Sequence, residues 1–155
     1  MLSRGQKASR ILGRYDDDKA VVEIYKILKP VFYKKLNKLR PSERVFCFLS
    51  TFKFLTETEG FDGFYKDESG NYSYEIYEAL ETIGASQYKA LFYESMKVYE
   101  GIVPKPQEER TLFITKHQDV CTELWTPLEA KFKTLDENFD KLLIEYVRTN
   151  LLEFR

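Results

Sequence analysis

Two side chains with catalytic potential, His117 and Cys121, stand four residues apart, which places them on one face of a helix. A histidine beside a cysteine can activate a thiolate nucleophile, but this chemistry also needs an orienting carboxylate and an oxyanion hole. Asp119 falls on a different face, and no glycine-rich turn adjoins the pair. We therefore predict that Cys121 is a core residue rather than a nucleophile. His117 is the only histidine, which excludes sites with several histidine ligands.

Eight acidic residues gather in the middle of the chain, where carboxylates could hold a metal, transfer protons or contact a basic surface. Residues 45–82 contain only two lysines, so this segment has a formal charge of −6. A calcium loop needs alternating oxygen ligands, whereas Phe64 and Lys66 follow Asp62 at those positions. We predict no metal and no cofactor, and a basic protein surface as the partner. The candidate contact residues are Glu57, Glu59, Asp62, Asp67, Glu68, Glu75, Glu78 and Glu81.

The opposite charge lies at the N-terminus. Residues 1–44 carry twelve basic and five acidic side chains, a formal charge of +7, while the whole chain is at −1. The basic segment could contact a phosphate backbone. The same layout is also typical of solvated helix faces, or of two halves that pack together and partly cancel. Direct nucleic-acid binding is therefore the less favoured alternative to a protein partner.

The composition indicates an ordinary globular protein. Of the 155 residues, 43% are apolar and 32% are charged, with only seven glycines and five prolines. No apolar stretch approaches the roughly 20 residues of a membrane helix, and no apolar signal region follows the basic N-terminus. We expect a cytoplasmic protein with no membrane contact, one domain over residues 1–155, and reduced thiols at Cys47 and Cys121.

Apolar residues recur three and four positions apart, which predicts an all-α, compact single-domain bundle of about six helices. Pro30 is expected to kink or split the first helix. Residues 126–129, Thr-Pro-Leu-Glu, resemble a capping box with proline at the first helical position, so a new helix is predicted there. The predicted helices cover about residues 17–40, 41–59, 73–83, 86–100, 108–125 and 137–152.

Residues 60–71 are predicted to form an irregular, glycine-rich aromatic loop between the second and third helices, because three glycines and alternating charges interrupt the helical pattern. Phe61, Phe64 and Tyr65 lie in this segment. Apolar rings in a loop either fill the core or await a partner, and we expect them to fill the core. A catalytic carboxylate site beside the glycines is the least favoured function.

Three short motifs follow one another in this region, at residues 60–65 (Gly-Phe-Asp-Gly-Phe-Tyr), 69–72 (Ser-Gly-Asn-Tyr) and 78–85 (Glu-Ala-Leu-Glu-Thr-Ile-Gly-Ala). Together with residues 135–139 near the C-terminus, they resemble the DNA-mimic protein (nineteen)-like family, a domain of unknown function. The resemblance extends over about residues 45–154 and leaves residues 1–44 as an N-terminal helical extension.

The resemblance implies an all-helical fold and a protein that presents acidic side chains in place of DNA phosphates. The family's Asn-Asn-Gly-Gly is Glu57-Thr58-Glu59-Gly60 in this chain, which adds two acids. Because the whole chain is nearly neutral, mimicry would depend on the −6 segment alone. We therefore predict a non-catalytic protein-binding module that engages a DNA-binding protein; an immunity-type inhibitor of a toxin fits the same chemistry.

Overall fold

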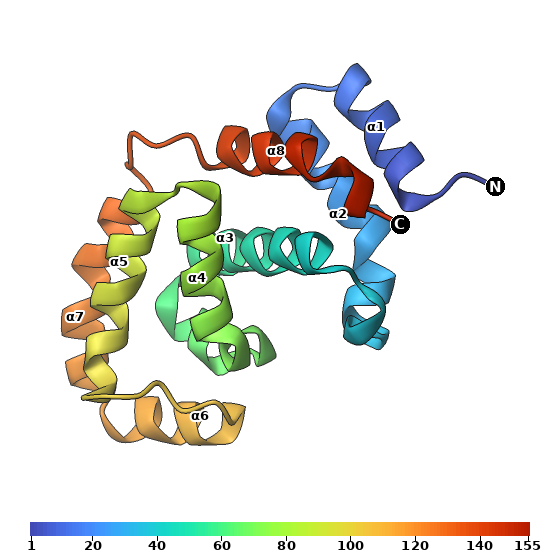
Figure 1. Cartoon of the computed structure of the whole chain (residues 1–155). Helices are drawn as coiled ribbons and strands as arrows, with labels where there is room; N and C mark the ends of the chain where they lie inside the picture. Colours follow the sequence, from blue (N-terminus) through green and yellow to red (C-terminus); the bar gives the residue numbers. More distant parts are fainter. The chain divides into compact units, whose positions relative to one another are not determined.

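The computed structural model describes all 155 residues and contains helices joined by short connections, without a β-strand (Figure 1). The all-α prediction is confirmed, but there are eight α-helices rather than about six. They are α1 (Arg4–Arg14), α2 (Asp17–Lys34), α3 (Pro41–Lys66), α4 (Ser73–Ile83), α5 (Ser86–Met96), α6 (Gln107–Lys116), α7 (Gln118–Phe132) and α8 (Phe139–Thr149). Four 3-10 helices are η1 (Leu36–Lys38), η2 (Glu68–Tyr72), η3 (Lys97–Tyr99) and η4 (Leu151–Glu153). None of the helices has the length and apolar character needed to cross a membrane.

The internal contacts divide the chain into two compact units. Unit 1 comprises Met1–Ser50 and Asn138–Arg155, and unit 2 comprises Thr51–Glu137. Residues 41–50 of α3 belong to unit 1, and residues 51–66 belong to unit 2.

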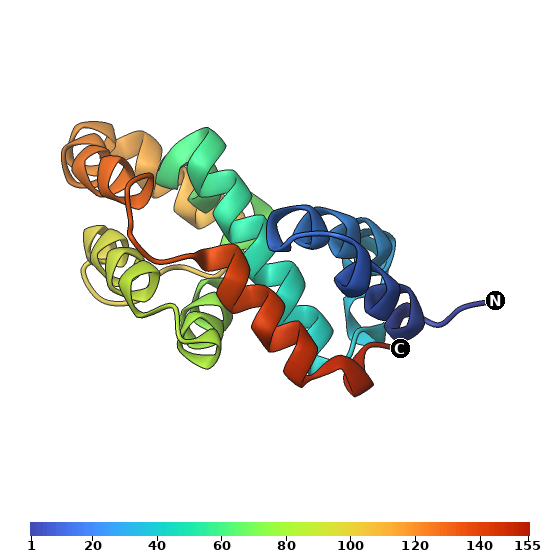
Figure 2. The same cartoon turned by 90° about the horizontal axis from the view of Figure 1, so that it is seen from above.

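In unit 1, α2 packs against both α1 and α8, and η4 lies beside α1 (Figures 1 and 2). A capping box starts α1: the Gln6 N–H donates to the Ser3 hydroxyl at 3.1 Å, and the Ser3 N–H donates to the Gln6 side chain at 2.9 Å. No helix was predicted here, because α1 buries only Ala8 and Leu12 and so shows little apolar periodicity.

One side of α2 is apolar and packs into unit 1. The buried side chains of α2 are Ala20, Ile24, Leu28 and Phe32. Val21 and Tyr25 are only partly covered. Pro30 does not split the helix, which continues to Lys34 before the chain turns into η1. Pro30 lies on the exposed side, so the carbonyl that it leaves without an N–H partner can be hydrated.

Unit 1 contains a buried carboxylate. Glu43, in the first turn of α3, is fully buried and accepts hydrogen bonds from the Arg4 guanidinium at 2.6 and 3.0 Å. It also accepts the backbone N–H of Arg40 at 2.9 Å and that of Arg155 at 3.3 Å. One side chain thus joins α1, the start of α3 and the C-terminus.

In unit 2, α5 packs against α4 and α7, and α6 lies across the N-terminal end of α7 (Figure 1). The predicted bounds of α4 are confirmed, and Gly84 ends the helix with a left-handed φ of 79°. No neighbouring side chain caps the start of α5. The Gln87 N–H instead donates to the Glu137 carboxylate at 3.2 Å, so an acid distant in sequence supplies the cap.

The predicted helix start at Thr126 is wrong. The helical structure is interrupted at His117, which separates α6 from α7. Helix α7 then continues through Pro127. The buried side chains of α7 are Cys121, Trp125, Leu128 and Phe132. Their spacing of four, three and four residues needs one uninterrupted helix, and the packing of this stripe outweighs the local capping signal.

The predicted irregular loop at residues 60–71 is also wrong. Gly60 kinks α3 at φ 72° and ψ −176°, after which residues 61–66 are helical again and η2 follows. Phe61, Phe64 and Tyr65 stand three and four positions apart, so a helical turn points all three rings inward. Each is fully buried, which confirms that the rings fill the core.

Candidate protein-binding surface

Unit 2 is organised around one aromatic cluster that fixes the surface helices. The Tyr65 ring stacks on Trp125 at 5.3 Å and on Phe92 at 6.2 Å between centroids. The Tyr65 hydroxyl lies 2.7 Å from the Ser95 hydroxyl, and the Trp125 indole N–H donates to the Ser95 carbonyl at 2.9 Å. These contacts join α3, α5 and α7 through both apolar and polar groups.

The kink in α3 is built by a glycine and a distant carboxylate. A side chain at residue 60 would place its Cβ 2.5 Å from a carboxylate oxygen of Glu129. That oxygen accepts the Phe61 N–H at 2.9 Å, so Glu129 caps the helical turn that follows the kink. Glu129 therefore does not form the capping box predicted at residues 126–129, and its carboxylate caps a turn of α3 instead.

A second buried network surrounds Arg110 of α6, which is fully buried. Its guanidinium donates to the carbonyls of Tyr65 at 2.8 Å and Asp67 at 2.9 Å, and to the Asn71 side chain at 2.8 Å. It also donates to the carbonyls of Pro104 at 3.0 Å and Lys105. Burial lowers the pKa of the Arg110 guanidinium, but an arginine remains protonated at neutral pH. The network ties the segment after the kink to the connection before α6.

The motifs that carry the family resemblance therefore build the interior of unit 2. Gly70 is buried, and a Cβ there would lie 2.7 Å from the Arg110 side chain. The neighbouring Asn71 supplies one of the guanidinium's acceptors. Gly60, as described, permits the kink. These positions are explained by packing, so they do not mark a binding surface.

The eight predicted acidic contact residues have different surroundings. Three are paired with lysines: Glu57 with Lys53 at 3.8 Å, Asp62 with Lys66 at 3.1 Å and Glu81 with Lys89 at 2.7 Å. Asp67 accepts the Ser69 N–H at 2.8 Å and so caps η2. The four that are exposed and have no ion pair are Glu59, Glu68, Glu75 and Glu78.

The structure brings Glu75, Glu78 and Glu81 onto the outward side of α4. The residues that α4 buries are Ser73, Ile76, Ala79, Leu80 and Ile83. The three glutamates are exposed and fall on the opposite side of the helix. Tyr74 lies on the same side and is 44% exposed, while its hydroxyl accepts the Val103 N–H at 2.9 Å. We call Tyr74, Glu75, Glu78 and Glu81 the acidic face of α4.

A row of tyrosines and lysines on α4, α5 and the start of η3 was not predicted from the sequence. The rings of Tyr77 and Tyr93 lie 6.2 Å apart. The Lys89 ammonium is 4.7 Å from the Tyr77 ring centre, and the hydrogen bond that it donates to the Glu81 carboxylate is the main cause of its raised pKa. Lys97 lies 5.3 Å from the Tyr93 ring centre. The Tyr77–Tyr93 and Lys89–Tyr77 contacts join two helices, so local spacing does not reveal them, whereas Lys97 and Tyr93 are only four residues apart.

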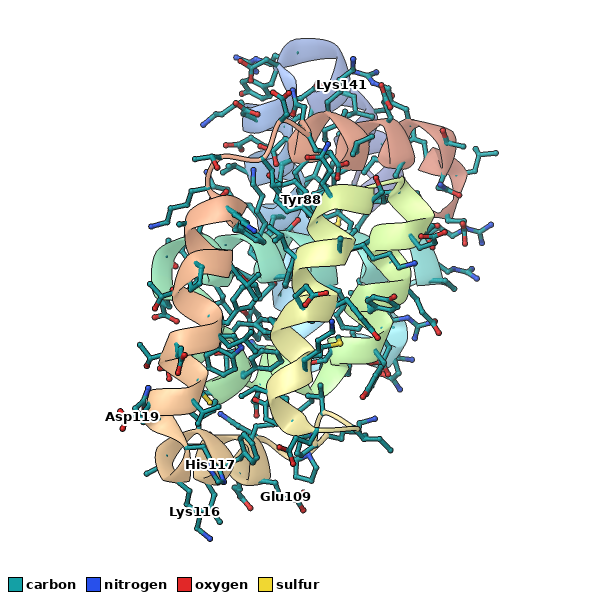
Figure 3. The ribbon with its side chains drawn as sticks, turned by 90° about the vertical axis from the view of Figure 1, so that its left-hand side faces the viewer. Tyr88, Glu109, Lys116, His117, Asp119 and Lys141 are labelled. Atoms are coloured by element: carbon teal, nitrogen blue, oxygen red, sulfur yellow. The ribbon has the colours of Figure 1, made fainter.

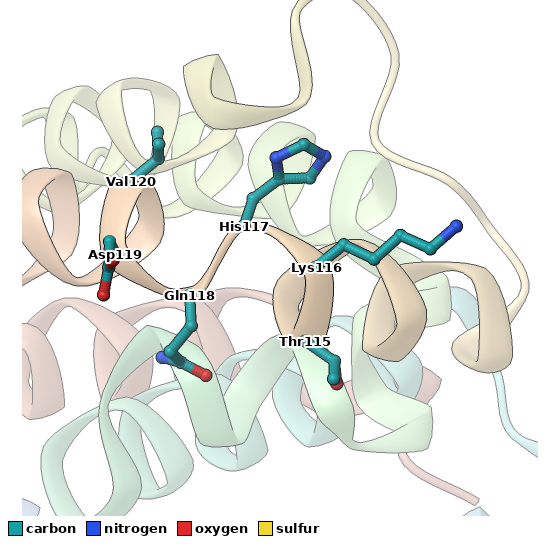
Figure 4. A pocket seen from close by; sticks show the side chains of 6 residues that line it. All are labelled: Thr115, Lys116, His117, Gln118, Asp119 and Val120. Carbon is teal, nitrogen blue, oxygen red and sulfur yellow. The ribbon is translucent and has the colours of Figure 1, made fainter.

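A surface pocket of about 360 Å³ lies at His117 and is lined by residues 115–120 (Figure 4). Lys116, His117 and Asp119 lie at the end of unit 2 where α6 meets α7 (Figure 3). The lining side chains point in different directions rather than toward one centre. Cys121 is fully buried, as predicted, and burial raises the pKa of its thiol. No three His, Cys, Asp or Glu side chains converge closely enough to hold a metal ion.

The family model described as DMP19-like protein matches residues 37–150. The chain belongs to the DMP19-like protein family. This confirms the resemblance drawn from the motifs at residues 60–85. Neither the curated proteins nor the solved structures contained a match. The DMP19-like match includes all of unit 2, whereas α1 and α2 precede it.

The two units of this DMP19-like chain carry opposite charges. Unit 1 has fifteen basic and eight acidic side chains, a formal charge of +7. Unit 2 has nine basic and seventeen acidic side chains, a formal charge of −8. The nearly neutral total therefore conceals an acidic unit that is more strongly charged than the −6 segment predicted from sequence.

Proposed function

We propose that this DMP19-like chain is a cytoplasmic, non-catalytic protein-binding module whose acidic face of α4 binds a basic protein surface. The observation that carries the proposal is the exposure of Glu75, Glu78 and Glu81 along one side of α4. Glu75 and Glu78 have no ion pair, so a partner's cations would not displace a lysine there. The −8 charge of unit 2 adds long-range attraction toward a basic partner.

The favoured partner is a DNA-binding protein. Residues three apart on a helix are separated by about 4.5 Å along its axis. A row of carboxylates at that spacing resembles the closely spaced charges of a DNA strand, about one per 3.4 Å. Membership of the DMP19-like family supports this choice. An immunity-type inhibitor of a toxin nuclease would use the same chemistry and is an outcome that the experiment distinguishes.

The test compares two variants with the same change in charge. Immobilised wild type, a Glu75→Lys, Glu78→Lys, Glu81→Lys variant and a Glu108→Lys, Glu109→Lys, Glu123→Lys control are exposed to nuclease-treated lysate of the source organism at low and high salt. We expect wild type and control to retain the same basic protein at low salt, and the α4 variant to lose it.

The retained protein is then purified and titrated with labelled DNA. A DNA-binding protein whose DNA is displaced by wild type, but not by the α4 variant, supports mimicry. Inhibition of a nuclease activity would instead indicate an immunity-type inhibitor. Retention of the same partner by the α4 variant at unchanged affinity would show that the acidic face of α4 is not the binding surface.

A further inference from the structure

The N-terminal helix presents a row of unpaired cations. Lys7, Arg10 and Arg14 of α1 are exposed, and α1 contains no acidic residue. None of the three forms an ion pair. The guanidinium carbon of Arg14 lies 5.4 Å from the centre of the Tyr15 ring. Elsewhere in unit 1, Lys19 and Lys26 both pair with Glu23 at 3.1 and 3.0 Å. The α1 cations are therefore available to an external anion.

Helical spacing aligns these three side chains. Positions separated by three, four and seven residues fall on one side of a helix, and together they span about 10 Å along its axis. We call Lys7, Arg10 and Arg14 the basic stripe of α1. A span of about 10 Å corresponds to about three successive phosphates along one strand of duplex DNA.

The helix that carries the stripe is held in place on its other side. The Arg4 guanidinium is bound by the buried Glu43 carboxylate at 2.6 and 3.0 Å. A Cβ at Gly5 would lie 2.3 Å from the Phe154 carbonyl, so α1 and the C-terminus are in close contact. The Leu12 carbonyl accepts a hydrogen bond from Arg148 at 3.2 Å. These contacts orient the stripe before any ligand binds.

We propose that the basic stripe of α1 binds the phosphate backbone of a nucleic acid without reading its sequence. The stripe lies in unit 1, and α1 is outside the residues matched by the DMP19-like family model. The proposal is therefore independent of the acidic face of α4. Nucleic-acid binding by the basic N-terminal segment was the less favoured alternative from sequence. The proposal assigns this binding to a defined surface and a defined ligand.

A nucleic acid fits this surface better than a membrane. Of the apolar residues of α1, Ala8 and Leu12 are buried within the fold, and Ile11 is partly exposed. The exposed residues of α1 are Gln6, Lys7, Ser9, Arg10, Gly13 and Arg14. An interfacial helix must insert a row of large apolar side chains into the bilayer, and α1 offers only the partly exposed Ile11. Phosphate contacts from lysine and arginine alone supply affinity without sequence readout.

Binding is measured by fluorescence anisotropy with a labelled DNA duplex of arbitrary sequence, over a series of salt concentrations. Three phosphate contacts contribute about −2.7 to the slope of log K against log salt, so wild-type affinity falls at least about 40-fold between about 50 and 200 mM salt. We expect a Lys7→Glu, Arg10→Glu, Arg14→Glu variant to bind more weakly and to lose about 2.7 from the slope.

The matched control is Lys34→Glu, Lys35→Glu, Lys38→Glu, which makes the same charge change on exposed residues of unit 1. Its salt slope is expected to stay closer to that of wild type. Equal losses in the two variants would overturn the assignment to α1, and an unchanged slope in the α1 variant would do the same. Glutamine substitutions at the same three positions replace the glutamates if circular dichroism shows that reversal unfolds the chain.

Two further measurements separate the possible ligands and the two proposals. Binding to phosphatidylserine vesicles, without binding to the duplex, would overturn the nucleic-acid assignment. The Glu75→Lys, Glu78→Lys, Glu81→Lys variant should retain the stripe's contribution to the salt slope. Loss of duplex binding and loss of the protein partner are thus observed in different variants.

Discussion

The two units bury charges opposite to those that they expose. Unit 1 has a formal charge of +7 and buries the Glu43 carboxylate, whereas unit 2 has a formal charge of −8 and buries the Arg110 guanidinium. Glu43 is paired with an oppositely charged side chain, Arg4. Arg110 has no carboxylate partner and is surrounded by carbonyl and amide oxygens.

The difference shows that surface charge and buried charge have separate physical roles. A buried charge is tolerated when hydrogen bonds replace its lost hydration, and the groups that replace it become fixed in space. Glu43 fixes the two ends of unit 1, and Arg110 fixes the segment after the α3 kink in unit 2. Among the exposed charges, those without an ion pair, such as Glu75 and Glu78, remain accessible from solvent.

The largest effect is expected from Arg110→Met in unit 2. The substitution removes five hydrogen bonds and leaves buried carbonyl oxygens without donors, which should lower the free energy of unfolding by about 3–5 kcal/mol. Urea unfolding followed by fluorescence of Trp125, the only tryptophan and a core residue of unit 2, measures the loss. An exposed Lys105→Met substitution is the control. A loss below about 1 kcal/mol would contradict a structural role for the network.

The corresponding change in unit 1 is Arg4→Met. It leaves the buried Glu43 carboxylate with two backbone donors and no cation, and should cost about 3 kcal/mol. The effect is expected to be smaller than that of Arg110→Met because Arg4 is itself partly exposed, with 23% of its side chain accessible. Thermal unfolding by circular dichroism measures the change. Arg10→Met, on the exposed side of α1, should leave stability unchanged.

A third comparison concerns two glycines with positive φ in unit 2. Gly60→Ala should cost about 1–3 kcal/mol, because its φ of 72° and ψ of −176° suit only glycine and its Cβ would meet Glu129. Gly84→Ala should cost about 1 kcal/mol, since its left-handed conformation is strained but no atom lies within 4 Å of the added Cβ. Equal losses in urea unfolding would show that the contact with Glu129 contributes nothing.

Tyr65→Phe should cost about 1–2 kcal/mol, less than either Arg110→Met or Arg4→Met. The Ser95 hydroxyl donates to the Phe92 carbonyl at 2.7 Å, so the Tyr65 hydroxyl donates to Ser95. The variant loses this buried hydrogen bond but keeps the ring stack. Tyr74→Phe is the control, because the Tyr74 hydroxyl accepts one hydrogen bond at a partly exposed site.

Tyr65 also predicts a dependence on alkaline pH. Burial raises the pKa of the Tyr65 hydroxyl above its ordinary value, so the folded chain keeps a proton that the unfolded chain releases near pH about 10. Stability should therefore fall as the pH rises above about 10. The fall should be less steep for Tyr65→Phe when unfolding is measured at successive alkaline pH values, and identical slopes would contradict it.

Part of the fold could be predicted from sequence because its signals are local. The bounds of α4 follow from apolar spacing, and the structure confirms them. The start of α2 follows from acidic residues that cap it: Asp16 accepts the Lys19 N–H at 3.0 Å. The inward direction of Phe61, Phe64 and Tyr65 follows from the cost of leaving large rings exposed.

Other features could not be predicted because their causes are distant in sequence. The α3 kink needs Glu129, the N-terminus of α5 needs Glu137, and the segment after the kink needs Arg110. The contacts that these side chains make with Phe61, Gln87 and Tyr65 each join residues at least 45 positions apart. Local composition therefore made residues 60–71 resemble a loop.

The amino-acid sequence by itself determined the helical class, the family resemblance and the separation of basic and acidic segments, because each depends on residue type and short-range spacing. Only the tertiary structure decided which charged side chains are buried and which form ion pairs. It buried Glu43 and Arg110, paired Glu81 with Lys89, and left Glu75 and Glu78 exposed without an ion pair. The reason is that hydration and pairing depend on neighbours in space, which a linear charge count does not contain.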